Sequence, residues 1–325
     1  MDGGAGTDTA DYGAATSGVT VSLAVAGAQN TGGAGVDTLT DLENLKGSAF
    51  NDSLSGSDVA NYLNGQAGND NIQGGNGDDI LDGGVGDDLL DGGADYDRVS
   101  YLYAAGAVSV DLGVVGPQAT GEGSDTLLNV EDVSGSAFAD TLIGNGVANG
   151  LHGNNGNDTL SGLAGNDTLA GWTGSDQLDG GEGNDSLEGE SGKDTLLGGL
   201  GDDLLKGGAA DYYSTGSNYA PLAGTDGDSM AGGAGNDTYQ VTATSTQQWF
   251  ETPGGYTLTT STGFSPDLVS ENPDEGTDTV EAYVSYTLPA NVENLVLMQA
   301  TFDINGSGNA LDNILPGNSE QNVLD

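Results

Sequence analysis

The chain has 325 residues, with 50 Asp and Glu against 4 Lys and Arg, so its formal net charge at pH 7 is -46. The sign of this charge disfavours nucleic acid and anionic membrane surfaces as partners and makes divalent cations the natural counter-ions. The absence of cysteine excludes disulfides, thiol catalysis and thiolate metal sites, and no apolar run approaches the roughly 18 residues that span a bilayer.

Residues 1–91 are predicted to form the first of three solenoid units. The unit begins with a glycine-rich row whose acidic residue is Asp8, alternating aliphatic residues predict a strand at 19–23, and a further row surrounds Asp37. Met1 falls within a row, and the last residues stop where another glycine pair is expected. We therefore expect the sequence to be a piece of a longer protein.

From residue 47 to residue 100 the chain can be written in consecutive rows of nine residues. The rows read GSAFNDSLS, GSDVANYLN, GQAGNDNIQ, GGNGDDILD, GGVGDDLLD and GGADYDRVS, and further rows of this kind run from residue 135 to residue 206. Position one is always Gly, position eight is always Leu, Ile or Val, and position six is Asp except at Asn61 and Asn149. A disordered acidic chain has no such period, so the repeat predicts a solenoid.

The spacing predicts the geometry of one row. Glycines at positions one, two and four favour a turn with positive φ, and the remaining residues form a short strand in which position eight points inward. Two rows make one circuit, so residues eighteen positions apart stack at the strand spacing of about 4.8 Å. The position-six aspartates then form stacks: Asp70 with Asp88, Asp79 with Asp97, Asp158 with Asp176 and Asp194, and Asp167 with Asp185 and Asp203.

Such stacks predict that the fold requires a cation. Carboxylates at this spacing repel each other by about 1 kcal/mol in water and more in a protein environment. Each row also buries only one large side chain, and the free energy gained by that burial has to offset the conformational entropy lost when nine residues become ordered. We therefore expect the roll to be unstable without bound cations.

The first two rows of each block depart from the pattern at position four, where Phe50, Val59, Phe138 and Val147 replace glycine. Bulky residues resist the left-handed turn, and position six of each second row is Asn. These lead-in rows are predicted to be apolar end caps or lead-in turns with weak or absent cation sites. We expect Phe50 to pack in the core rather than to bind a ligand.

A longer unit of about 88 residues also repeats and divides the rest of the chain. The second unit is placed at 92–231, contains the block 135–206 and has its own additional row around Asp125. The third, degenerate unit is placed at 232–325 and begins with GGAGNDTYQ, whose acidic residue is Asp237.

Two inserts, 207–231 and 241–270, interrupt the third copy and concentrate aromatic residues. These are Tyr212, Tyr213, Tyr219, Trp249, Phe250, Tyr256 and Phe264. A covering loop or terminal cap is the favoured interpretation, and recognition of a specific ligand is the alternative.

The nonapeptide GGxGxDxUx resembles the repeats-in-toxin (RTX) family, also called the haemolysin-type calcium-binding repeats. The resemblance implies an all-β fold, a parallel β-roll or β-solenoid with calcium-binding turns, and export by type I secretion. It also implies that one row supplies carbonyl oxygens from positions two and four, and the row eighteen residues later from positions one and three. Calcium suits such turns because it takes six or more oxygen ligands.

The calcium ligands expected on this basis are aspartates and turn glycines. The aspartates are Asp8, Asp37, Asp52, Asp70, Asp79, Asp88, Asp97, Asp125, Asp140, Asp158, Asp167, Asp176, Asp185, Asp194, Asp203 and Asp237. The glycines are Gly75, Gly77, Gly84, Gly86, Gly92, Gly165, Gly174, Gly181, Gly183, Gly198, Gly199 and Gly201.

No catalytic machinery is recognised in the sequence, so we expect the chain not to be an enzyme. The sole histidine, His152, occupies position nine of a row and faces outward, without a nucleophile placed beside it by any motif. Paired carboxylates are abundant, but their regular spacing favours a role as metal ligands over acid and base catalysis.

Three functions remain open. The first is a calcium-binding module of a bacterial secreted or cell-surface protein that folds on calcium outside the cell. The second is an accessory repeat domain of an extracellular protease, lipase or polysaccharide epimerase, and the third is an adhesin or surface-layer rod. Calcium ions are the expected partners in all three, with cell-surface or polysaccharide ligands or self-association as further candidates, and with no nucleic acid and no membrane span.

Overall fold

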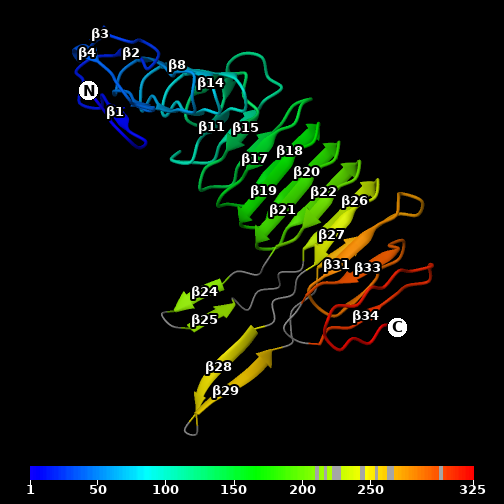
Figure 1. Ribbon diagram of the computed structural model, residues 1–325. Coiled ribbons are helices and arrows are strands. Elements are labelled where there is room, and N and C mark those ends of the chain that lie inside the picture. Colours follow the sequence, from blue (N-terminus) through cyan, green and yellow to red (C-terminus); the bar gives the residue numbers. More distant parts are fainter. Residues whose placement is uncertain are drawn as a thin grey trace. The chain divides into compact units, whose positions relative to one another are not determined.

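The computed structural model describes residues 1–208, 228–241, 267–299 and 303–325, together with the backbone of two hairpins in the inserts (Figure 1). Every regular element in this part of the chain is a β-strand, and no helix long and apolar enough to cross a membrane occurs among these residues. The chain divides into two compact units, Met1–Asn154 and Asn155–Asp325. The three sequence units 1–91, 92–231 and 232–325 stay a prediction about the repeat.

Unit 1 contains two parallel sheets built from alternate strands. One sheet has the order β1-β5-β7-β9-β11-β15-β17, the other has the order β2-β6-β8-β10-β14 with β13 added antiparallel, and β12 pairs with β16. The strands are β1 (Thr9–Asp11), β2 (Thr20–Ser22), β3 (Ala28–Gly32), β4 (Gly35–Thr38), β5 (Asn44–Lys46), β6 (Ser53–Ser55), β7 (Tyr62–Asn64), β8 (Asn71–Asn76), β9 (Ile80–Asp82), β10 (Leu89–Ala94), β11 (Arg98–Ser100), β12 (Ser109–Asp111), β13 (Gln118–Ala119), β14 (Ser124–Leu128), β15 (Asp132–Ser134), β16 (Thr141–Ile143) and β17 (Gly150–His152).

Unit 2 follows the same plan. One parallel sheet has the order β19-β21-β23-β27-β31-β33 and the other has the order β18-β20-β22-β26-β30, while β24–β25 and β28–β29 are antiparallel hairpins. The strands are β18 (Thr159–Ala164), β19 (Thr168–Thr173), β20 (Gln177–Glu182), β21 (Ser186–Ser191), β22 (Thr195–Leu200), β23 (Leu204–Lys206), β24 (Tyr212–Thr215), β25 (Asn218–Pro221), β26 (Ser229–Ala234), β27 (Thr238–Val241), β28 (Thr246–Thr252), β29 (Gly255–Ser261), β30 (Leu268–Ser270), β31 (Thr279–Ala282), β32 (Tyr286–Thr287), β33 (Asn294–Leu297) and β34 (Gly306–Ser307).

The strand register confirms a parallel β-roll with two rows per circuit. Ile72 of β8 lies opposite Leu90 of β10, and Leu81 of β9 lies opposite Val99 of β11, each pair eighteen residues apart. Consecutive rows therefore alternate between the two sheets, and every second row stacks on the same sheet.

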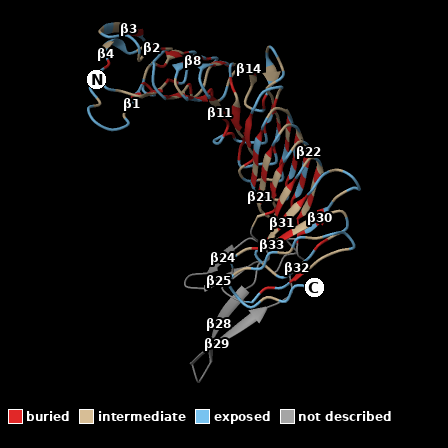
Figure 2. Cartoon of the chain, turned by 45° about the vertical axis from the view of Figure 1, so that its right-hand side comes forward, coloured by how far each residue is buried: buried red, intermediate tan, exposed pale blue. Residues whose placement is uncertain are grey.

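In the regular rows the core is a column of position-eight side chains. In β6, β7, β16 and β23 the middle residue is buried while both neighbours are more exposed, which is the two-residue period of a strand. Figure 2 shows this buried column along the strands, with exposed residues concentrated in the turns. One aliphatic residue per row suffices because each row packs against the rows before and after it.

The prediction that the position-four residues of the lead-in rows are buried caps is wrong. Phe50 and Phe138 are 45% and 46% exposed, and Val59 and Val147 are exposed to a similar extent. None of the four residues adopts positive φ. Position four lies at the outside of the turn, so replacing its glycine changes the turn conformation without directing the side chain inward.

The aromatic residues predicted as ligand-binding candidates in the inserts lie outside the residues whose side chains the structure describes. In the sequence, their segments lie between β23 and β26 and between β27 and β30. The parallel pairs β23–β27 and β26–β30 show that the roll continues past both inserts.

Leu196 and Leu197 provide a matched test of the one-residue core. Leu196 is 1% exposed and Leu197 is 44% exposed on the same strand, β22. We expect Leu196→Ala to lower the free energy of unfolding by about 2–5 kcal/mol, because it leaves a cavity in the column. Leu197→Ala should change it by about 0.5 kcal/mol or less. Denaturant unfolding at saturating calcium measures both, and equal losses would contradict the assigned core.

Candidate metal centre

The position-six aspartates stack in register at the turns, where each carboxylate closes the turn of one row. In unit 1 the main-chain N–H of Asp70 donates to Asp88 Oδ1 (2.8 Å), and the N–H of Asp79 donates to Asp97 Oδ1 (2.8 Å). All four side chains are buried. This bond between position six and the residue eighteen positions later explains why aspartate, with its short side chain, recurs there.

The same bond continues through unit 2 and defines its two stacks. One stack contains Asp158, Asp176, Asp194, Asp228 and Asp267, and the other contains Asp167, Asp185, Asp203, Asp237, Asp278 and Glu293. Each N–H donates to a carboxylate oxygen of the next member, at distances from 2.8 to 3.4 Å. The stacks of unit 1 are Asp52, Asp70, Asp88 and Asp125 on one side, and Asn61, Asp79, Asp97 and Glu131 on the other.

The second carboxylate oxygen has no donor in many members of the stacks. It is buried and accepts no hydrogen bond in Asp70, Asp79, Asp88, Asp97, Asp176, Asp185, Asp203 and Asp237. A buried anionic oxygen without a partner is costly, and natural folds satisfy such atoms with a donor, water or an ion.

These oxygens point into spaces that a position-one glycine leaves open. A Cβ atom placed on Gly198 would lie 2.5 Å from Asp203 Oδ2 and 2.6 Å from the carbonyl oxygen of Gly232, one circuit later. Gly180 has the corresponding relation to Asp185 Oδ2 and to the carbonyl oxygen of Gly198. Carboxylate and carbonyl oxygens that converge on one space are the donor set that calcium prefers. The residues present therefore fit calcium.

Burial raises the pKa values of several stacked aspartates above the usual value for this side chain. It raises the pKa of Asp79, Asp88 and Asp203 to about 7, and neighbouring carboxylates add to the rise while the main-chain hydrogen bond opposes it. Burial likewise raises the pKa of Asp70 and Asp176 to about 6. A divalent ion among these groups would restore their ionised form.

The family comparison identifies the repeat. The model of the RTX calcium-binding nonapeptide repeat (4 copies) matches residues 40–70, 64–99, 152–187, 188–211 and 222–239. The chain therefore contains RTX calcium-binding nonapeptide repeats over these residues. Its RTX rows are calcium-binding repeats, in agreement with the oxygen sets described above.

Comparison with whole proteins adds little to this family assignment. No curated protein matches the sequence. Among solved structures, the extracellular lipase LipA from Serratia marcescens is similar at 17% sequence identity with a TM-score of 0.22. The match covers 69% of this chain and 38% of the lipase chain, so this chain spans little more than a third of that protein.

Most glycines expected at the RTX turns have the backbone conformation that such turns require. Gly183 has φ of 136°, and a Cβ there would overlap the carbonyl oxygen of Gly165. Positive φ is shared by Gly75, Gly77, Gly84, Gly86, Gly165, Gly174, Gly181, Gly183, Gly199 and Gly201. The position-one glycines Gly92 and Gly198 lack positive φ and instead leave room for the carboxylate of their own row.

The expected ligand in the first row of each block, Asp52 or Asp140, already has donors. Ser48 donates its N–H to Asp52 Oδ2 (2.5 Å) and its hydroxyl to Asp52 Oδ1 (2.8 Å). Ser136 makes the same two bonds to Asp140. Serine at position two therefore supplies hydrogen bonds where other rows have an open oxygen, and the ligand roles of Asp52 and Asp140 stay predictions.

The expected ligands of the wider rows are also bonded to side chains. Asp125 Oδ2 accepts bonds from the hydroxyls of Thr120 (2.6 Å) and Tyr101 (3.2 Å). Asp37 Oδ2 accepts a bond from Thr31 Oγ1 (3.1 Å). Asp8 differs from these residues, because its Oδ2 is buried without a hydrogen-bond partner.

Asparagine rows have no open anionic oxygen. Asn61 Oδ1 accepts the N–H of Ser57 (2.7 Å), and its Nδ2 donates to the carbonyl oxygen of Glu43 (2.7 Å). Asn149 and Asn313 repeat this arrangement within their own copies. The amide group thus supplies a donor to a carbonyl oxygen in these rows, and they need no cation for charge balance.

Several members of the stacks were not predicted from the sequence. Glu43, Glu131 and Glu293 accept the main-chain N–H of Asp8, Asp97 and Asp278, at 2.9, 3.1 and 2.9 Å respectively. Asp228, Asp267 and Asp278 extend the stacks of unit 2. For these three aspartates, the sequence pattern that could have identified them is an acid two residues before a buried apolar residue, as in DSMA, DLVS and DTVE. The glycine pattern that precedes the acid in regular rows is lost or degenerate there.

His152 belongs to an ion-pair group on the outer face of unit 1. Asp132 Oδ2 lies 2.5 Å from Arg98 Nη2, and Asp132 Oδ1 lies 3.4 Å from His152 Nε2. The group joins β11, β15 and β17. This group contains the sole histidine and one of the four basic residues of the chain.

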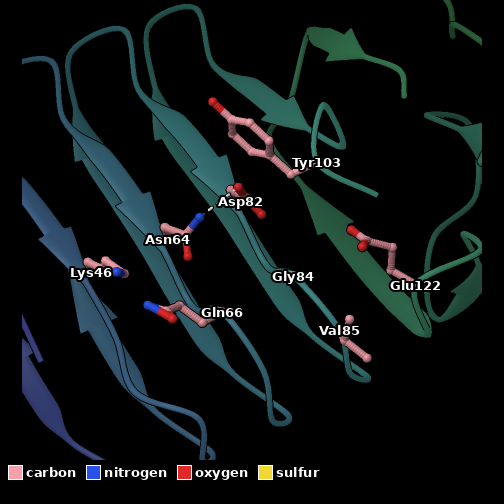
Figure 3. Close-up of a pocket in the computed structure, with 8 residues that line it drawn as sticks. All are labelled: Lys46, Asn64, Gln66, Asp82, Gly84, Val85, Tyr103 and Glu122. Atoms are coloured by element: carbon pink, nitrogen blue, oxygen red, sulfur yellow. Dashed lines mark hydrogen bonds between the residues drawn. The ribbon is translucent and has the colours of Figure 1, made fainter. Parts of the chain in front are cut away.

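A pocket of about 310 Å³ lies on unit 1 across β5, β7 and β9 (Figure 3). It contains two acidic residues, Asp82 and Glu122. Asp82 Oδ2 accepts bonds from Asn64 Nδ2 (2.7 Å) and Tyr62 Oη (3.1 Å), and burial raises the pKa of Glu122 to about 7. Because chain donors already serve Asp82, this pocket differs from the RTX stacks.

Substitutions of Asp202 and Asp203 distinguish the effect of losing a negative charge from the effect of losing a calcium ligand. Asp203 is buried with an open Oδ2, whereas its neighbour Asp202 is exposed. We expect Asp203→Asn to raise the calcium concentration at half-saturation by about tenfold or more, because a metal ligand matters at least as much as its supporting partners. Asp202→Asn should leave it within about twofold. Isothermal titration calorimetry compares them, and an equal effect of both changes would contradict the assignment of Asp203.

The raised pKa values predict that protonation of the buried aspartates can partly substitute for bound calcium in stabilising the fold. Unfolded aspartate titrates near about 3.9, below the folded pKa of about 7 for Asp79, Asp88 and Asp203. Protonation therefore favours the calcium-free fold, with full effect below about pH 4 and loss as pH rises through about 7. In calcium-depleted buffer, the far-UV circular dichroism of strands should increase as pH falls from about 7.5 to about 4. A signal that stays flat or decreases would contradict this linkage.

Proposed function

We propose that this chain is a calcium-triggered folding module of a bacterial secreted or cell-surface protein. The single observation that carries the proposal is the series of buried aspartate oxygens without donors along the stacks of both units. These oxygens make the calcium-free roll costly, and calcium ions bound at the turns would remove that cost.

The small core supports the same conclusion. Each row contributes one position-eight side chain to the interior, and the chain has no disulfides that could stabilise it otherwise. The net charge of -46 also opposes compaction until cations bind. The folding equilibrium therefore depends on the calcium concentration.

An extracellular location follows from this dependence. Extracellular calcium modules bind at about 10⁻⁴ to 10⁻³ M, well above cytosolic calcium concentrations. A chain that is unfolded inside the cell and folds outside suits export in an unfolded form. Export of this kind is what we propose for the protein that contains these RTX rows.

We further propose that this chain is not itself catalytic. The acidic residues that could act as acid and base are arranged in regular stacks, and His152 contacts the side chains of Arg98 and Asp132. Any catalysis in the parent protein would then belong to another domain, which leaves an accessory domain of an extracellular enzyme as the second candidate. A structural rod at the cell surface is the third.

Removal of calcium tests the proposal. In EGTA at pH 7.5 the chain should lose most of its strand circular dichroism and expand. Addition of calcium to about 10⁻³ M should restore both the strand signal and a compact hydrodynamic radius. Magnesium at the same concentration is the control and should not restore them, because it demands a smaller octahedral site. Identical spectra in EGTA and calcium would overturn the proposal.

A further inference from the structure

Glu271 occupies a position where every regular RTX row has glycine. Strand β30 pairs with β26 so that Ser270 lies opposite Ala231, and the next residues are Glu271 and Gly232. The N–H of Gly232 donates to Glu271 Oε1 (3.3 Å). Glu271 therefore stands at position one of its own row.

The row of Glu271 is longer than a regular row, which makes room for this side chain. Asp237 follows Gly232 by five positions, whereas Asp278 follows Glu271 by seven. A Cβ at Gly232 would overlap the carboxylate of Asp237 in its own row. The two additional residues relieve this conflict in the next row and allow a glutamate side chain to enter the turn.

Three carboxylates converge as a result. Asp237, Glu271 and Asp278 each offer an oxygen, and these oxygens all lie within 4.8 Å of one another. Asp237 is 1% exposed and its Oδ1 accepts the N–H of Asp203 (2.9 Å), so its Oδ2 is left buried without a donor. Glu271 Oε2 is also buried without a donor. Both open oxygens belong to residues of this one cluster.

No cation of the chain is seen to balance this cluster in the described residues. The ion pairs given for Lys46, Arg98 and Lys206 are with Asp11, Asp132 and Glu188. Burial, with Asp278 and Asp237 nearby, raises the pKa of Glu271 to about 8. Three carboxylates held together in this way favour a bound divalent ion.

The cluster also has room for water ligands. Glu271 lines a pocket of about 290 Å³ together with Asn272 and Glu275. Calcium takes six to eight oxygen ligands, and waters commonly complete the set where the protein supplies fewer. The pocket gives such waters access from the side of Glu271.

We propose that Glu271 is a third carboxylate ligand of a calcium ion held with Asp237 and Asp278, and that this site binds calcium more tightly than the sites formed by two stacked aspartates. The proposal rests on the calcium-binding function proposed above. Its physical basis is ligand charge, because calcium affinity rises with the number of carboxylates at a site of given rigidity. The site lies after the second insert and would fill at lower calcium concentration than the regular RTX rows.

Glu271→Gln tests the proposal, with Glu281→Gln as the matched control. Each change removes one negative charge, after β30 for Glu271 and within β31 for Glu281, but Glu281 Oε2 accepts a bond from Gln240 Nε2 (3.0 Å) outside the cluster. Native mass spectrometry of the full chain during calcium titration counts bound ions. We expect Glu271→Gln to lose one ion from the tightest class and to require about tenfold more calcium to fill that site. Glu281→Gln should behave like the wild type.

Two further measurements keep the outcome clear. Asp278→Asn removes another carboxylate of the same cluster and should cause the same loss, while circular dichroism at saturating calcium should show the strand content of the wild type in every variant. Unchanged ion counts in Glu271→Gln, or an equal loss in Glu281→Gln, would overturn this inference alone. A wild-type chain that binds no calcium would overturn the proposed function as well.

Discussion

The fold depends on how one carboxylate divides its two oxygens. In a regular RTX row the first oxygen of the position-six aspartate accepts the main-chain N–H of the row one circuit earlier, which fixes the register of the sheet. The second oxygen is then buried beside the position-one glycine with no donor of its own. The same residue therefore builds the strand register and presents an oxygen for calcium, which is why we propose that folding and calcium binding are coupled.

The number of carboxylate oxygens left without a donor differs from one row to the next. Asn61 places an amide where an aspartate would leave an open anionic oxygen, and Asp52 receives two hydrogen bonds from Ser48. At the other extreme, Glu271 adds a third carboxylate to a pair of stacked aspartates. Small changes at positions one, two and six thus set whether a row has no open carboxylate oxygen, one such oxygen or a cluster of three carboxylates.

The sequence predicts the solenoid well because its two periods are geometric. Glycine at position one and an aliphatic residue at position eight specify a turn and a buried strand residue, and eighteen-residue stacking follows from two rows per circuit. Single-row chemistry is harder to predict. The serine that satisfies Asp52 looks like ordinary turn composition, and Phe50 lies on the outside of the turn although its apolar character suggests burial. Glu131 does not fit the sequence pattern, because its row lacks the usual glycines and a glutamate, rather than an aspartate, accepts the main-chain N–H of Asp97.

Alternation of the rows between two sheets also constrains how such a chain can change length in evolution. Duplication or loss of two rows returns every later residue to the sheet it occupied before. Loss of a single row would move every later residue to the opposite sheet, and Glu131 and Asn149 would then enter the other stack. Regular rows tolerate that exchange because they are alike, but these specialised rows do not. An insertion or deletion of eighteen residues therefore keeps every later row on its own sheet, whereas one of nine residues does not.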